Sequence, residues 1–62
     1  MKKKTREEIL NEVVDINGSK VFVENGEVKT VLSEEIQRTG YMTVEEARQL
    51  LHAIIEKEYR LP

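Results

Sequence analysis

The sequence predicts a small single-domain α+β fold: a helix, an antiparallel β-hairpin or three-stranded meander, a short helix, and a long C-terminal amphipathic helix packed on one sheet face. Three observations support this prediction. Two Asn-Gly dipeptides, at 17–18 and 25–26, frame a strand-like run at 19–24, and Asn-Gly favours two-residue hairpin turns. Ser or Thr followed by glutamates stands where helices would begin. Apolar residues recur at helical spacing from 44 to 55.

The first helix is predicted from the segment Thr5 to Glu8, which has the S/T-x-x-E pattern of a capping box. The segment before it, 1–4, is expected to form a disordered basic tail of the single domain 1–62. Where the helix ends is left open by the β-branched run at 13–16, which fits either a last helical turn or a first strand.

The sheet register follows from the two turns, because each Asn-Gly fixes which residues face each other. The first turn would place Val14 opposite Val21, and the second would place Val23 opposite Val28. The two registers agree on one apolar face, made of Val14, Ile16, Ser19, Val21, Val23, Val28, Thr30 and Leu32. The opposite face is mixed, and we call it the outer sheet face: Val13, Asp15, Lys20, Phe22, Glu24, Glu27, Lys29 and Val31.

Two further helices are predicted after the sheet. Ser33 is a candidate N-cap for a short helix that ends near Gly40. Thr43 and Glu46 repeat the capping-box pattern and begin the long helix. Its expected core stripe is Val44, Ala47, Leu50, Leu51, Ile54 and Ile55, with Glu45, Gln49, His52, Glu56 and Lys57 pointing away. Residues 60–62 are expected to fray.

The composition argues against an enzyme. A chain of 62 residues has little room for a deep pocket, and it contains no cysteine and one histidine, His52. His52 is expected to contact Glu56 one helical turn away and to have no nucleophile to activate. No cofactor, metal or small-molecule substrate is predicted. The absence of cysteine and of a long apolar run favours a cytoplasmic protein with no membrane contact.

The outer sheet face is the predicted interaction surface. Phe22 is the only phenylalanine, and an aromatic side chain on a solvent-facing surface favours a contact with another molecule. The candidate residues are Phe22, Val31, Lys20, Lys29 and Val13. The competing interpretation is that the first helix or the tail covers this face. The predicted function is protein–protein interaction by a small regulatory or accessory module, with homodimerisation as a plausible part of it.

Nucleic-acid binding is the alternative prediction, carried by the basic arm of Lys2, Lys3, Lys4 and Arg6. Residues 41–51 are also similar to the opening of excisionase-type helix-turn-helix domains, in which such a segment forms the first helix of the motif. In that family the segment is followed by a turn and a recognition helix. Here the helical pattern continues through 52–56 without a break, so no recognition helix is expected to follow.

Overall fold

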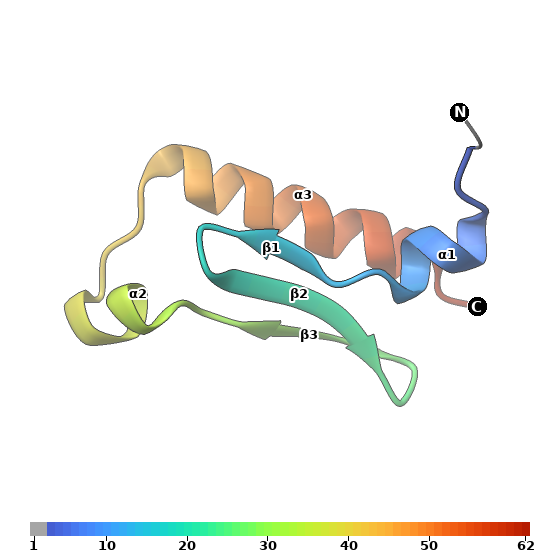
Figure 1. Cartoon of the computed structure of the whole chain (residues 1–62), viewed down its shortest axis with the longest axis horizontal. Coiled ribbons are helices and arrows are strands. Elements are labelled where there is room, and N and C mark those ends of the chain that lie inside the picture. The colour runs from blue at the N-terminus through green and yellow to red at the C-terminus, as the bar shows by residue number, and fades with distance from the viewer. Residues whose placement is uncertain (1–2) are drawn as a thin grey trace.

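A computed structural model describes residues 3–62, which form an α+β fold with one sheet. The elements in chain order are α1 (Arg6–Asn11), β1 (Val14–Ile16), β2 (Ser19–Glu24), β3 (Glu27–Val31), α2 (Glu34–Thr39) and α3 (Val44–Arg60). Helix α3 lies lengthwise along the sheet, with α1 and α2 at opposite ends (Figure 1). The predicted fold class is confirmed, and the ambiguous segment before Asn17 is a strand.

The three strands are antiparallel in the order β1-β2-β3. Both turns have the expected backbone, because Asn17 and Asn25 have φ of 50° and 52° and the glycines after them have φ of 93° and 75°. The register pairs Val14 with Val21 and Val23 with Val28, as predicted. The local turn chemistry therefore decides which side chains share a face.

The core lies between the predicted apolar sheet face and α3. Its buried residues are Ile16, Val21, Leu50 and Ala53, with Val14, Val28, Leu32 and Ile54 packed against them. Val21 is fully buried at the centre of the sheet. The long helix thus packs on the face that the turn registers selected.

The helix ends are capped where the sequence indicates. The Thr5 hydroxyl accepts a hydrogen bond from the Glu8 N–H, and the Ser33 hydroxyl accepts one from the Ile36 N–H. At the start of α3 both arms of the capping box are present between Thr43 and Glu46. Each cap satisfies N–H groups that have no partner within the helix.

The first turn is tied to the start of α2. Ser19 is fully buried, and its hydroxyl accepts a hydrogen bond of 2.9 Å from the Ser33 N–H. The position of a Cβ on Gly18 would lie 3.3 Å from the Ser33 Cβ, whereas a Cβ on Gly26 would meet nothing within 4 Å. The turn at Asn17-Gly18 is therefore packed against the start of α2, whereas the turn at Asn25-Gly26 has open space beside it.

The rotation of α3 about its axis differs from the prediction. Four residues expected in the core are exposed instead: Val44, Ala47, Leu51 and Ile55. Ala53 and Lys57 are buried beside Leu50 instead, which turns the helix by roughly a quarter turn relative to the expected stripe. The apolar residues of α3 span an arc of about 140°, and the hydrogen bonds of Lys57 to α1 favour one edge of this arc over the other.

Helix α3 is continuous from Val44 to Arg60. It therefore has no break at the point where an excisionase-type domain would turn toward a recognition helix. Arg60 is the last helical residue, and both Arg60 and Leu61 are half-buried. Within residues 3–62, no helix has the length and apolar character needed to cross a membrane.

Candidate interaction surfaces

The structure places four of the five predicted contact residues on the outer sheet face. Phe22 and Lys29 are paired across β2 and β3, and Lys20 is paired with Val31. Phe22 is half-buried, whereas both lysines are exposed and Val31 keeps 50% of its surface exposed. Val13 lies just before β1 and is 56% exposed. The outer sheet face is therefore open to solvent at Val31, and Val13 is exposed just before the sheet begins.

Charge on this face is partly compensated within it. The Lys29 ammonium lies 3.0 Å from a Glu27 carboxylate oxygen. This hydrogen bond and the charge of Glu27 raise the pKa of Lys29. Lys20 has no ion-pair partner among the described residues.

The basic arm is only partly described. Lys2 lies outside the described residues, whereas Lys3, Lys4 and Arg6 are exposed. Lys4 forms an ion pair with Glu12, which compensates one of the positive charges that the nucleic-acid alternative requires. Arg6 is the first residue of α1.

A second apolar surface lies on α3, and it was not predicted. It consists of Val44, Leu51, Ile55 and Tyr59, which are 77%, 58%, 56% and 80% exposed. We call these four residues the outer stripe. They fall within an arc of about 80° on the helix, roughly opposite to the buried residues. The spacing in the sequence could not reveal this surface, because helical periodicity is the same for a stripe in a core and a stripe in solvent.

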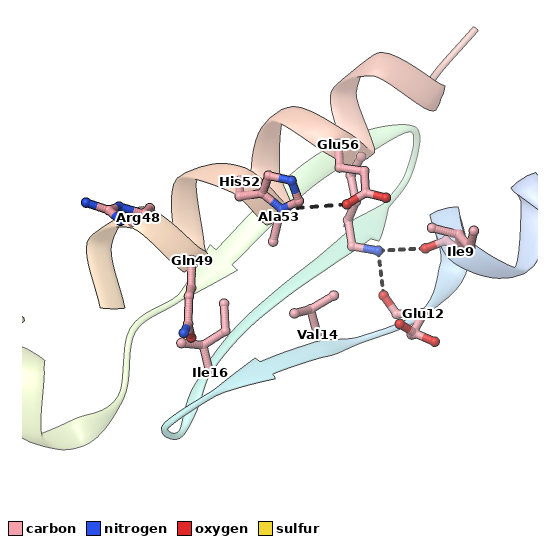
Figure 2. A pocket seen from close by; sticks show the side chains of 10 residues that line it. Ile9, Glu12, Val14, Ile16, Arg48, Gln49, His52, Ala53 and Glu56 are labelled. Atoms are coloured by element: carbon pink, nitrogen blue, oxygen red, sulfur yellow. Dashed lines mark hydrogen bonds and ion pairs between the residues drawn. The ribbon is translucent and has the colours of Figure 1, made fainter. Parts of the chain in front are cut away.

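A groove of about 610 Å³ runs between α3, β1 and the end of α1. Its apolar lining comes from Ile9, Val14, Ile16 and Ala53, and its polar lining comes from Glu12, Arg48, Gln49, His52, Glu56 and Lys57. Figure 2 shows His52 and Glu56 pointing toward each other on α3. The His52 Nδ1 lies 3.8 Å from a Glu56 carboxylate oxygen, which confirms the predicted contact.

Lys57 lines the groove and joins α3 to α1. It was expected to point away, but it is 2% exposed. Its ammonium donates hydrogen bonds of 2.9, 3.1 and 2.6 Å to the backbone carbonyls of Ile9, Leu10 and Glu12. These carbonyls end α1, so a positive charge lies where the helix dipole is negative.

Burial lowers the pKa of Lys57, while the charge of Glu56 partly opposes the shift. The side chain remains suited to its place because its aliphatic stem packs in the groove and its ammonium is fully used by carbonyl oxygens. Lys57 therefore has a structural role.

Among residues 3–62, no group of three or more His, Cys, Asp or Glu is arranged to hold a metal ion.

No protein-family model, curated protein or solved structure matches this chain. Its function is therefore inferred from the surfaces described above.

Proposed function

We propose that this chain is a non-enzymatic protein–protein interaction module, a small regulatory or accessory domain of the cytoplasm that binds a partner through the outer stripe. The observation that carries this proposal is the exposure of four large apolar side chains on one side of α3. Three of them, Val44, Leu51 and Ile55, are aliphatic. Burial of these side chains against another molecule would remove apolar surface from water, which is favourable.

The free energy available from burying these side chains favours a binding role. Full burial of an aliphatic side chain contributes about 1.5–3 kcal/mol. Leu51 and Ile55 lie one helical turn apart near the middle of α3, with more than half of each side chain exposed. A partner that covered both would gain several times the free energy of a surface ion pair. Such a stripe on a rigid helix is also pre-organised, which limits the entropy lost on binding.

The surroundings of the stripe resemble those of a protein interface. Arg48, His52 and Glu58 are exposed beside it, so an apolar centre has a polar and charged rim. The outer sheet face is the second candidate surface. It contributes less exposed apolar area, because Phe22 is half-buried and flanked by the exposed Lys20 and Lys29.

The proposal is tested by affinity capture from an extract of the source cells. The bait is the wild type, the double variant Leu51→Asp/Ile55→Asp, or the outer-sheet variant Val31→Asp, which introduces one aspartate at a similarly exposed position. We expect a protein, or the chain itself, to be held by the wild type and Val31→Asp and lost from the double variant. Circular dichroism checks that all three baits are folded.

Capture that is the same for the wild type and the double variant would contradict the role of the outer stripe. Loss of capture in Val31→Asp alone would move the interface to the outer sheet face. The nucleic-acid alternative is measured separately by titrating duplex DNA at low and moderate salt. Affinity that falls steeply with salt would indicate phosphate contacts and would favour the basic arm.

A further inference from the structure

The exposed side of α3 follows a heptad-like spacing that includes two charged residues. Val44, Arg48, Leu51, Ile55 and Glu58 are separated by alternating steps of four and three residues, the spacing of a helix that packs along a second helix. All five are exposed. These five positions fit one helix's half of a two-helix seam, with a charged residue on each side of the apolar pair Leu51 and Ile55.

The four central positions of this seam are symmetric about a single point. Leu51 and Ile55 lie two residues before and after residue 53, and Arg48 and Glu58 lie five residues before and after it. We propose that the partner is a second copy of this chain, bound by antiparallel pairing of the two α3 helices about a two-fold axis at the level of residue 53. This proposal rests on the proposed function and names its partner.

An antiparallel pair places unlike groups at each level, because residues on either side of the centre exchange places. Leu51 of one protomer lies level with Ile55 of its partner, which makes two apolar layers across the axis. Arg48 lies level with Glu58 of the second protomer, which makes two opposite-charge layers outside them. Arg48 and Glu58 take part in none of the ion pairs among the described residues, so both are free for this contact.

A parallel pair of the same helices is disfavoured by charge. Each residue would then lie level with its own copy, so Arg48 would face Arg48 and Glu58 would face Glu58. Like charges at both ends of a short seam repel each other, and this repulsion selects the antiparallel arrangement. The charge pattern therefore specifies both the partner and its direction.

The size of the seam sets the expected strength of the dimer. A helix of 17 residues is about 25 Å long, so the contact lies at the small end of specific interfaces. We expect a reversible dimer with a dissociation constant on the order of 100 µM. Sedimentation equilibrium up to about 1 mM protein covers this range.

Charge exchange tests the proposed contact. The single variants Arg48→Glu and Glu58→Arg each turn two attractive layers into repulsive ones, and we expect each to weaken the dimer by about tenfold or more. The double variant Arg48→Glu/Glu58→Arg restores opposite charges and should recover the wild-type dissociation constant. Because both side chains are exposed, all variants should fold, and thermal melts check this.

The direction of pairing is read with spin labels. The chain has no native cysteine, so Glu45→Cys and His52→Cys each carry one label per protomer. In the antiparallel dimer the two copies of position 45 are about 24 Å apart along the helix axis and the two copies of position 52 about 3 Å apart. A long distance at 45 with a short one at 52 supports the proposal, whereas two similar short distances indicate a parallel pair and overturn it.

The outcomes separate this inference from the proposed function. A wild type that stays monomeric up to about 1 mM, or a dimer unaffected by both single charge reversals, would overturn self-pairing through α3. If the outer stripe nevertheless captures another protein in the extract, the interaction function stands and only the identity of its partner changes. If the outer stripe captures nothing and the chain is monomeric, both proposals fail.

Discussion

Leu50 and Leu51 are adjacent residues of the same type, and they differ in almost everything else. Leu50 is 5% exposed and belongs to the core with Ile16 and Val21, whereas Leu51, about 100° further around α3, is 58% exposed. The rotation of a helix about its own axis, and not residue type, decides which of the two stabilises the fold.

The same contrast between a packed and an open position recurs elsewhere in the chain. Gly18 packs close to Ser33 while Gly26 faces open space. Lys57 is buried against α1 while Lys29 is exposed on the sheet. In each pair the residue type is the same and the burial differs, so a difference in stability between the two variants measures the effect of position. The pair Leu50 and Leu51 also distinguishes the side of α3 that packs in the core from the side that we propose binds a partner.

The largest difference is expected between Leu50→Ala and Leu51→Ala. Truncating a buried leucine costs about 2–5 kcal/mol, and a domain of this size has a total stability of about 3–5 kcal/mol. Leu50→Ala should therefore leave much of the chain unfolded. Leu51→Ala should change the free energy of unfolding by less than about 0.5 kcal/mol. Urea denaturation followed by circular dichroism, at a concentration low enough to keep the chain monomeric, measures both.

Equal losses of stability in these two variants would contradict the rotation of α3 described above. The apolar arc would then be centred between the two leucines, as its sequence spacing predicts. The outer stripe would no longer be a free surface, and the proposed interaction through it would lose its support.

The next largest effect is expected from Lys57→Met. This change keeps an aliphatic stem but removes the ammonium that three carbonyls at the end of α1 accept. Helix α1 has six residues and none is buried, so it is too short to persist without this support. We expect its local stability to fall by about 1–3 kcal/mol, seen as faster amide exchange at Ile9 and Leu10 while the amide of Val21 stays protected.

Lys29→Met is the matched control, because Lys29 is exposed and contacts Glu27 and not α1. It should leave amide exchange in α1 unchanged. If Lys57→Met also leaves α1 protected, the packing of Ile9 beside the groove holds the helix, and the hydrogen bonds of Lys57 are not needed for its position.

These contrasts show where sequence reasoning succeeds in this chain. The turns at Asn17 and Asn25, the caps at Thr5, Ser33 and Thr43, and the resulting sheet register were all predicted correctly. Each depends on a few neighbouring residues whose backbone geometry or hydrogen bonds are nearly decided by local chemistry. The agreement of two adjacent turns then propagates this local information to the faces of the whole sheet.

The rotation of α3 could not be predicted in the same way. Its apolar residues span an arc wide enough to offer more than one packing face, and the choice depends on a contact between Lys57 and carbonyls 45 to 48 residues away in the chain. A lysine is normally assigned to the solvent because its charge is costly to bury. That rule assigned Lys57 to the solvent-facing side of α3, and the residues of the outer stripe Val44, Leu51 and Ile55 were therefore assigned to the core.

A smaller contrast is expected between Gly18→Ala and Gly26→Ala. Both glycines have positive φ, of 93° and 75°, so alanine is strained at either position by about 1–2 kcal/mol. At Gly18 the added Cβ also lies 3.3 Å from the Ser33 Cβ, in a region fixed by the Ser19 hydrogen bond. We expect Gly18→Ala to lose about 1 kcal/mol more than Gly26→Ala in urea denaturation. Equal losses would mean that the first turn can move away from α2 without cost.

The smallest effect is expected at the start of α3, between Glu46 and its neighbour Glu45. Glu46 accepts a hydrogen bond from the Thr43 N–H, and this bond lowers the pKa of its carboxyl group. Because the folded state then holds this proton less tightly than the unfolded state, the contribution to stability is present above the usual glutamate pKa. It is lost as the pH falls through the lowered value.

Glu46→Gln keeps an oxygen acceptor that does not titrate, so it should remove this part of the acid destabilisation. We expect the melting temperature of Glu46→Gln to fall less steeply than that of the wild type between about pH 5 and pH 3. Glu45→Gln is the control, because Glu45 bonds the Gln49 side chain and not the backbone of the cap; its profile should follow the wild type. Parallel profiles for the wild type and Glu46→Gln would show that the capping box of α3 works equally well with a protonated Glu46.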